Sequence, residues 1–357
     1  MEEEKKVKKA EEVDAKILLR LFHKYEEIDN YFSQPALKYI RENESDALWV
    51  GTEKIHGTNF SFICNGQSVL CGKRTSILKK TDQFYHHLKM STRYEQNILN
   101  LFVLMQELIP TLKLVRVFGE YYGGNYEHPD VPKTEKPIQK GIFYSPNLEF
   151  EAFDIFVEYV DEESETLELI RKYYPYKKAI ELFKEARIPY AEILYEGTLS
   201  CVLEEIKTAN IDNFESRIYL KHDLPKIENN IAEGIVIKEN EAKSNTNPRT
   251  SLKIKSLKFM EKSQIAEMKC TVPEEEKEMI CDRATSYITE NRLDNVVSKL
   301  KKNQKQRKKI QTMLVNDAWK DFCKEESEDI VSKAKEFKSI IFFKLNEKAY
   351  PLIAQFK

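Results

Sequence analysis

The sequence predicts an α+β protein with two domains, a mixed domain over residues 1–261 and a small all-α domain over residues 262–357. A chain of 357 residues is long enough for roughly two domains of ordinary size. All ten glycines lie between Gly51 and Gly234, so turns that need a positive φ are concentrated in the first two thirds. Strand-type and helix-type stretches mix there without a regular βαβ order, which favours the α+β class.

Hydrophobic periodicity predicts the individual elements. Alternating or short apolar runs bounded by turn residues predict strands at 48–52, 60–64, 112–118, 150–157, 234–238 and 251–256. Apolar residues three and four apart predict helices at 1–24, 98–109, 176–186, 286–300 and 310–323. The polar segment 245–250 is expected to be a loop. Almost everything after residue 260 has helical spacing, which separates the second domain from the first.

Composition and charge exclude several classes of protein. The net charge is −2, from 57 basic and 59 acidic residues, which excludes a uniformly basic nucleic-acid coat but not a local basic patch. No apolar run approaches the ~20 residues of a membrane-spanning helix. The six cysteines include no CxxC pair, which argues against a zinc ribbon and fits reduced thiols inside a cell.

The expected compartment is therefore intracellular, with the cytoplasm favoured and an organelle left open. The acidic start of the chain, Met-Glu-Glu-Glu, argues against a signal or transit peptide. An import sequence removed upstream of this chain remains an open alternative.

The segment Glu53-Lys54-Ile55-His56-Gly57-Thr58-Asn59-Phe60 leads from one predicted strand into the next. A lysine placed on a loop between two core strands is held by both of them. Taken alone, the Lys-x-x-Gly pattern is short and frequent, and an exposed turn lysine is its ordinary interpretation.

Further charged and aromatic residues recur at the ends of predicted strands. They are Arg74 after Gly72-Lys73, Glu120 beside Gly119, Phe153 in an alternating strand, Glu233 and Lys238 at either end of a strand, and Lys253 and Lys255. The last two are two positions apart, and hence on one face of a strand. Each has an ordinary interpretation by itself, as a surface cation, a surface ion pair or a core aromatic residue.

Together and in this order, the residues resemble the six motifs of the covalent nucleotidyltransferases, which are polynucleotide ligases and mRNA capping enzymes. The Lys-Ile-His-Gly-Thr-Asn sequence and the Lys-Arg-Thr triplet at 73–75 resemble the RNA ligase 2 family of phage-type and kinetoplastid RNA-editing ligases. DNA ligases and capping enzymes usually carry Asp where this chain has His56. Residues 22–31 and 286–299 also resemble that family, so the resemblance spans most of the chain.

The resemblance implies an adenylyltransferase domain (1–261) built on antiparallel sheets with flanking helices, and a helical domain (262–357) that grips RNA around a nick. It implies an ATP-dependent RNA ligase that seals 3′-OH/5′-phosphate breaks, preferentially nicks in duplex RNA. ATP would adenylylate a lysine, AMP would pass to the RNA 5′-phosphate, and a 3′-OH would displace it. The ion expected is Mg²⁺, with Mn²⁺ tolerated in its place.

The resemblance also implies residue roles. Catalytic roles fall to Lys54, Arg74, Glu120, Glu233, Lys253 and Lys255. Nucleotide binding falls to Glu53, Lys54, Ile55, His56, Asn59, Arg74, Glu120, Phe153, Lys238, Lys253 and Lys255. Glu233 and Asn59 would hold the metal, and Arg74 and Arg292 would contact RNA. His56 could equally be a structural hydrogen-bonding residue.

Several features stay open at the sequence level. Glu233 and Lys238 are five apart, so they share a face only if there is a bulge or if Glu233 precedes the strand. The insert at 124–150 has no evident chemical role. Residues 299–309 hold seven basic residues and form either a solvated helix face or a phosphate-binding track. The helical domain could instead bind a partner protein, and a monomer is expected.

Two other functions compete with a ligase. A GTP-using capping guanylyltransferase is disfavoured by His56 and by the helical pattern after residue 260, where an all-β tail would be expected. A non-catalytic RNA-binding scaffold is disfavoured because binding alone would not require six intact residues: Lys54, Arg74, Glu120, Glu233, Lys253 and Lys255.

Overall fold

The computed structural model describes residues 22–33, 36, 39–40, 47–133, 136–161, 168–241, 249–261, 272–300 and 307–355. The chain divides into two compact units, residues 1–259 and residues 260–357, a division that lies close to the boundary expected at 261. Most of the helix expected at 1–24 and of the loop expected at 245–250 lies outside the described residues. The predicted α+β class is confirmed by the two sheets and the helices described below.

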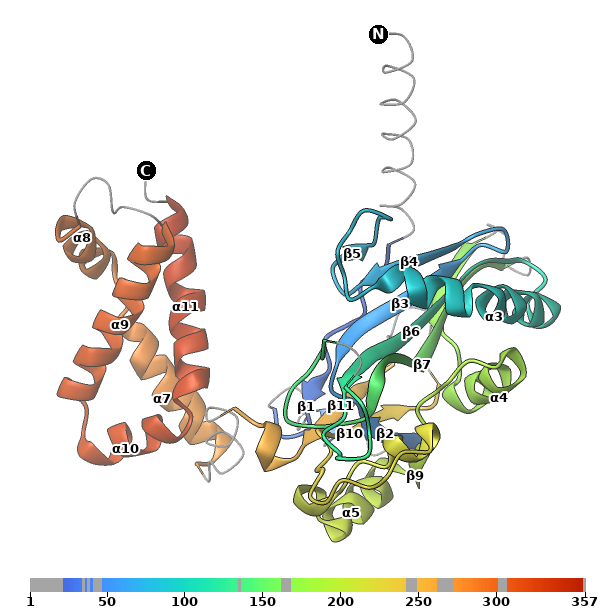
Figure 1. Cartoon of the computed structure of the whole chain (residues 1–357). Helices are drawn as coiled ribbons and strands as arrows, with labels where there is room; N and C mark the ends of the chain where they lie inside the picture. The colour runs from blue at the N-terminus through green and yellow to red at the C-terminus, as the bar shows by residue number, and fades with distance from the viewer. Residues whose placement is uncertain are drawn as a thin grey trace. The chain divides into compact units, whose positions relative to one another are not determined.

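The first unit is built on two sheets (Figure 1). The five-stranded sheet has the order β1 (Asp29–Asn30), β11 (Ser251–Lys255), β10 (Gly234–Glu239), β2 (Trp49–Lys54) and β9 (Ile193–Gly197). The six-stranded sheet has the order β5 (Ser76–Ile77), β4 (Val69–Lys73), β3 (Thr58–Cys64), β6 (Leu112–Asn125), β7 (Ser145–Asp161) and β8 (Glu168–Tyr173). All strand pairs within them are antiparallel except β1 with β11.

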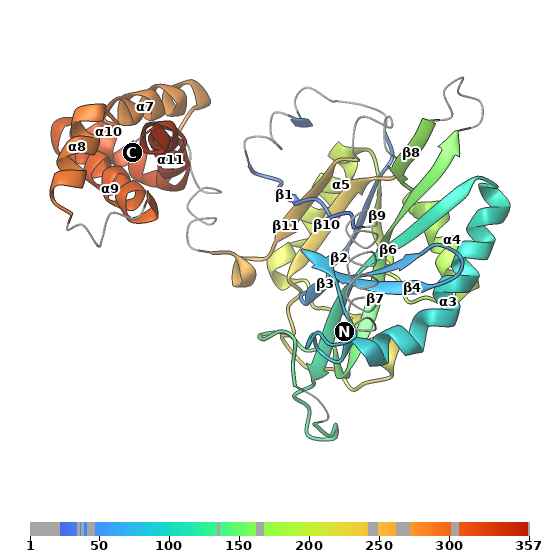
Figure 2. The ribbon, with the colours of Figure 1, turned by 90° about the horizontal axis from the view of Figure 1, so that it is seen from above.

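Helices cover one face of each sheet. Helices α3 (His87–Leu108) and α4 (Tyr176–Ala186) pack on the six-stranded sheet around a core that includes Phe62, Ile98 and Val117 (Figure 2). Helix α5 (Leu199–Ala209) packs on the five-stranded sheet. Short 3₁₀ segments follow at Ile211–Asn213, Ile218–His222 and Leu257–Phe259. Because side chains alternate along a strand, the residues next to these core positions point to the other face of each sheet, which the helices do not cover.

Most of the strands that carry the motifs extend beyond their predicted bounds. Strand β2 runs through Lys54, so this lysine ends a strand instead of lying on a loop. Strand β6 continues past residue 118 to Asn125, which places Glu120 inside the strand. A side chain at Gly119 would come within 2.3 Å of the Phe150 ring, so glycine there serves close packing and does not end the strand. Strands β8 and β9 and helix α5 were not predicted.

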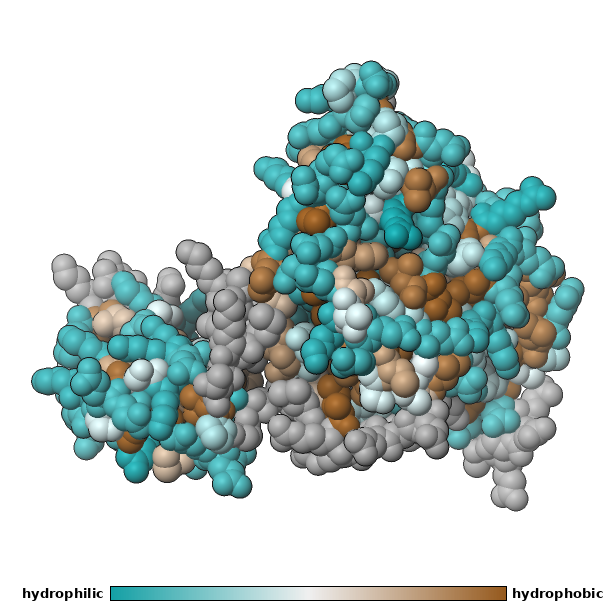
Figure 3. Space-filling model, turned by 90° about the horizontal axis from the view of Figure 1, so that it is seen from below, coloured by the Kyte–Doolittle hydropathy of each residue, from teal (hydrophilic) through white to brown (hydrophobic). Residues whose placement is uncertain are grey.

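The second unit is helical. It contains α7 (Glu274–Ser286), α8 (Glu290–Ser298), α9 (Arg307–Glu325), α10 (Glu328–Glu336) and α11 (Lys338–Gln355) around its own apolar core. The single helix expected at 286–300 is wrong in its start, because Thr289 accepts from the Arg292 backbone N–H and caps a helix that begins at Glu290. On the face drawn in Figure 3 this unit is mostly hydrophilic. Within the described residues, no helix is long and apolar enough to span a membrane.

Candidate active site

A cavity of about 520 Å³ lies in the first unit, lined by strands of both sheets. Among the described residues, the twelve site residues predicted in this unit all line it: Glu53, Lys54, Ile55, His56, Asn59, Arg74, Glu120, Phe153, Glu233, Lys238, Lys253 and Lys255. Arg292, the remaining predicted residue, belongs to the second unit. The structure thus brings together motifs spread over two hundred residues of sequence.

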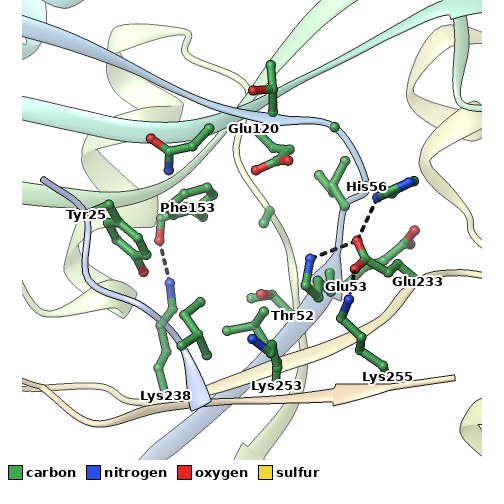
Figure 4. A pocket seen from close by; sticks show the side chains of 18 of the residues that line it. Tyr25, Thr52, Glu53, His56, Glu120, Phe153, Glu233, Lys238, Lys253 and Lys255 are labelled. Carbon is green, nitrogen blue, oxygen red and sulfur yellow. Dashed lines mark hydrogen bonds and ion pairs between the residues drawn. The ribbon is translucent and has the colours of Figure 1, made fainter. Parts of the chain in front are cut away.

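The Glu233 carboxylate holds three cationic or imidazole side chains together (Figure 4). Its Oε2 lies 2.8 Å from Lys54 Nζ and 3.1 Å from His56 Nδ1, and its Oε1 lies 2.9 Å from Lys255 Nζ. Burial opposes ionisation of this carboxyl, but the His56 and Lys54 contacts outweigh burial and hold the pKa of Glu233 below its usual value. Glu233 is therefore an anion that contacts two lysines and an imidazole.

Two glycines allow this close arrangement. A Cβ at Gly57 would lie 2.3 Å from the Tyr121 carbonyl oxygen, so the loop after Lys54 packs directly on β6. A Cβ at Gly234 would lie 2.0 Å from the Ile254 carbonyl oxygen. Gly234 opens β10, and Glu233 directly precedes that strand. The pre-strand position for Glu233, one of the two alternatives left by its spacing to Lys238, is thereby confirmed.

Lys238 lies at the opposite side of the cavity in a buried polar network. Its Nζ is 3.1 Å from Asp154 Oδ1, donates to the Phe153 carbonyl oxygen, and lies 3.5 Å from the centre of the Tyr176 ring. Asp154 also accepts from Arg249 at 2.5 Å. Burial lowers the pKa of Lys238 to about 7, although the charge of Asp154 acts in the opposite direction.

The two lysines of β11 point into the cavity, as their spacing predicted. Leu252 and Ile254 face the apolar core, whereas Lys253 and Lys255 line the cavity. Burial, reinforced by the charges of Lys255 and Lys54, lowers the pKa of Lys253. The cavity wall formed by β11 and β10 is therefore suited to an anion.

Phe153 is aimed into the cavity by a β-bulge. Phe118 pairs with Asp154 and Gly119 pairs with Ala152, so Phe153 is the extra residue on β7. Strict alternation did not predict this bulge.

Glu120 also lines the cavity. Burial raises the pKa of its carboxyl to about 7, and the charge of Lys54 partly offsets this rise.

The remaining predicted residues differ in their surroundings. Asn59 pairs with Glu120 across β3 and β6, whereas the half-exposed Arg74 guanidinium lies 3.7 Å from Glu27. In the second unit, Arg292 donates to Asp317 at 2.9 Å and to Asp321 at 2.7 Å. Its guanidinium is thus engaged within its own unit, and a contact of Arg292 with RNA stays a prediction.

Glu53 gives a testable pH effect. Burial raises the pKa of this carboxyl to about 7, and one of its oxygens has no hydrogen-bond partner among the described residues. A carboxyl whose pKa is raised on folding stabilises the protein below its unfolded pKa, and that contribution is lost as the pH rises through about 7. We expect Glu53→Gln to remove this loss, which is at most about 1.4 kcal/mol per pH unit.

The measurement is thermal unfolding of both proteins from pH 5 to pH 8. The difference in unfolding temperature should grow in favour of Glu53→Gln as the pH rises. A difference that stays constant with pH would contradict the assignment of the titration to Glu53.

Some residues that form the site were not predicted. Residues Tyr25, Glu26, Glu27 and Ile28 line the cavity from a segment before the first motif strand. Tyr25 donates to Asp154 at 2.8 Å and meets the Phe153 ring edge-on at 5.1 Å. Asp154 is not among the residues predicted for the site, although a carboxylate in a strand of buried type is a usable signal.

Comparison with known proteins decides the family. Residues 47–255 match the family model described as RNA ligase, and residues 271–351 match the model described as T4 RNA ligase 2 C-terminal. The first match alone covers more than half of the chain. The chain belongs to the RNA ligase family. The prediction of an enzyme, and of an RNA ligase in particular, is thereby confirmed.

Two curated relatives of this RNA ligase come from Trypanosoma brucei brucei. The chain is 28% identical to mitochondrial RNA-editing ligase 2 over 372 aligned positions, which cover 87% of this chain and 85% of the relative. It is 26% identical to mitochondrial RNA-editing ligase 1, covering 86% of this chain and 76% of the relative. These matches agree with the resemblance to editing ligases.

A solved structure of a Naegleria gruberi RNA ligase resembles the chain more distantly. It shares 16% sequence identity at a TM-score of 0.44 and covers 66% of this chain. The chain spans a little over half of that protein, 56% of its length.

Proposed function

We propose that this RNA ligase uses ATP to seal 3′-OH/5′-phosphate breaks, preferentially nicks in duplex RNA, through a lysyl-AMP and an RNA-adenylate. The observation that carries the proposal is the place of Lys54, 2.8 Å from a carboxylate and inside a cavity whose walls carry three further lysines. A lysine amine needs desolvation or nearby positive charge to act as a nucleophile at neutral pH. A cavity of about 520 Å³ is of the size that takes a small ligand.

In the first step, Lys54 Nζ would attack the α-phosphorus of ATP. A bond from nitrogen to phosphorus forms, the bond to the pyrophosphate oxygen breaks, and Nζ loses a proton. Lys238, Lys253 and Lys255 would neutralise the triphosphate and the charge that develops during transfer. Their common placement on β10 and β11 supports this role.

The nucleoside would lie between Phe153 and the cavity wall formed by the end of β2. The Phe153 ring, turned inward by its bulge, offers a surface on which adenine can stack. Glu120 would accept from ribose hydroxyls, and Glu53, Ile55 and His56 would contact the nucleotide. Support for these roles is that all of them line the same cavity.

The donor set is compatible with Mg²⁺ held mainly by substrate and water. Within the described residues there is no cluster of three or more His, Cys, Asp or Glu side chains fit to hold a metal. Mg²⁺ commonly keeps several waters and uses one or two protein oxygens together with phosphates. Glu233 and Asn59 would supply those oxygens. When bound, the ion would neutralise phosphate charge.

In the later steps AMP would pass from Lys54 to the RNA 5′-phosphate, and a 3′-OH would then displace AMP. Arg74 would contact the 5′-phosphate, because it is cationic, half-exposed and at the edge of the cavity. Arg292 and the helical unit would contact the RNA around the nick. The trypanosome relatives are mitochondrial, whereas the compartment of this chain, a protein partner and a monomeric state stay predictions.

The test is incubation of the protein with α-labelled ATP and Mg²⁺, followed by addition of a nicked RNA duplex. A labelled protein band that disappears as sealed RNA forms is the expected result. A band that persists would contradict sealing of this substrate, and labelled GTP with a capping acceptor would then be tried. No band with either nucleotide would favour a scaffold that binds RNA without catalysis.

Truncation after residue 261 separates the roles of the two units. The first unit contains the whole cavity and its own apolar cores, whereas the second has a separate core. We expect the truncated protein to form lysyl-AMP at close to the full-length rate and to seal nicks at least about tenfold more slowly, since phosphate contacts contribute much of the affinity for nucleic acid. Sealing at the full-length rate would contradict an RNA-binding role of the helical unit.

A further inference from the structure

The segment between β6 and β7, which has no evident role in the sequence, is tied to a distant part of the first unit. The Phe143 backbone N–H donates to Asn230 Oδ1 at 3.0 Å, and Asn230 Nδ2 donates back to the Phe143 carbonyl oxygen at 2.6 Å. The Tyr126 hydroxyl donates to the Pro225 carbonyl oxygen. The segment is therefore anchored both near its start and near its end.

Tyr144, at the end of this segment, reaches the loop that follows Lys54. Its side chain is fully buried, and its hydroxyl oxygen accepts the backbone N–H of His56 at 2.9 Å. The Tyr144 ring meets the Tyr122 ring edge-on at 5.2 Å. The same apolar cluster contains Ile55, Ile142 and Ile218.

The hydrogen bond from His56 to Tyr144 is one of two contacts that hold a very short loop. Only residues 55–57 separate β2 from β3. Gly57 packs on β6, as its closeness to the Tyr121 carbonyl shows, and the Tyr144 hydroxyl holds the backbone of His56. Because this loop directly follows Lys54, its conformation affects the direction of the Lys54 side chain. The loop also carries the His56 imidazole, which contacts Glu233.

We propose that Tyr144 is a positioning residue for lysyl-AMP formation, acting through the His56 backbone to hold Lys54 and Glu233 in their mutual arrangement. This inference rests on the function proposed above. In this interpretation, the segment between β6 and β7 serves to hold the loop of residues 55–57, which follows Lys54, in place.

Tyr144 acts through the loop and not on the nucleotide. Among the described residues that line the cavity it is absent. Burial, together with the negative charges of Glu53, Glu233 and Glu120, holds the pKa of its hydroxyl well above the usual value. The hydroxyl therefore stays protonated and exchanges no proton during the reaction.

The experiment compares Tyr144→Phe with Tyr126→Phe in the full-length protein. Both variants lose one tyrosine hydroxyl of the same segment, but only the Tyr144 hydroxyl contacts the loop. We expect Tyr144→Phe to slow single-turnover formation of lysyl-AMP by about 10- to 100-fold. The ATP concentration that gives half the maximal rate should not change, because Tyr144 does not reach the cavity. Tyr126→Phe should keep the wild-type rate.

A second readout distinguishes positioning from general packing. Sealing of pre-adenylated nicked RNA does not require attack by Lys54, so Tyr144→Phe should keep most of that activity. Asn230→Leu removes both hydrogen bonds to Phe143 and should slow lysyl-AMP formation by a smaller factor. This variant tests the role of the segment even if Tyr144→Phe folds poorly.

Three results would overturn the inference. They are a wild-type rate of lysyl-AMP formation in Tyr144→Phe, equal losses in Tyr144→Phe and Tyr126→Phe, and equal losses in the adenylylation and sealing steps. A wild-type protein that forms no adduct would instead overturn the proposed function itself.

Discussion

Replacement of Lys54 by alanine is expected to abolish the covalent AMP adduct, with a fall in its rate of formation of about 10⁴-fold or more, as for loss of other catalytic nucleophiles. The other lysines of the cavity, Lys238, Lys253 and Lys255, belong to β10 and β11, and we expect none of them to take the place of Lys54 at the end of β2. The fold should persist, since Glu233 keeps His56 and Lys255 as partners. The measurement is retention of label on denatured protein after incubation with α-labelled ATP.

A matched control and a second substrate sharpen this test. Lys226 is exposed, is paired with Glu215 at 2.9 Å and does not line the cavity, so Lys226→Ala should form the adduct as the wild type does. Lys54→Ala should still seal pre-adenylated RNA, because that step needs no lysine adduct. Label that persists in Lys54→Ala would remove Lys54 as the nucleophile.

The chemical motifs could be predicted from the sequence because each is local. The Lys54 segment is contiguous, and the two-residue spacing of Lys253 and Lys255 by itself dictates a shared face. These residues indeed line one cavity. The C-terminal helices followed from 3.6-residue periodicity in the same way, although the start of α8 depended on the Thr289 cap.

The supporting residues could not be predicted because their partners are far apart in sequence. Tyr25 meets Asp154 across 129 residues, and Tyr144 meets His56 across 88. The β-bulge at Phe153 depends on how β6 pairs with β7, which no single strand reveals. Local patterns thus predicted the reactive side chains, whereas the contacts that orient them required the tertiary structure.

Asp154→Asn is expected to destabilise the protein by about 3–5 kcal/mol, the usual effect of removing one partner from a buried ion pair. Asp154 is fully buried and accepts from Lys238, Arg249 and Tyr25. The neutral amide leaves the two cations with no full counter-charge. Lys238 should then leave its place in the cavity wall, and lysyl-AMP formation should fall with stability.

The matched control is Asp321→Asn in the helical unit. Asp321 also binds an arginine, but it is about one-third exposed and Arg292 keeps Asp317 as a second partner. Ion pairs near the surface contribute little to stability, so this variant should lose far less. Equal losses of unfolding free energy in the two variants, measured by denaturant titration, would contradict the argument from burial.

A double variant separates the stability effect of Asp154 from its effect on catalysis. Replacing Lys238 by methionine as well removes one uncompensated charge, so part of the stability lost in Asp154→Asn should return. Lysyl-AMP formation should stay low, because the cation that faces the nucleotide is gone.

The pH dependence of stability gives an independent check. Arg249 and Lys238 outweigh burial and lower the pKa of Asp154. The stabilising effect of Asp154 is therefore present above its unfolded pKa and is lost as the pH falls through its folded pKa. Asp154→Asn should therefore lose less stability than the wild type on acidification below about pH 4.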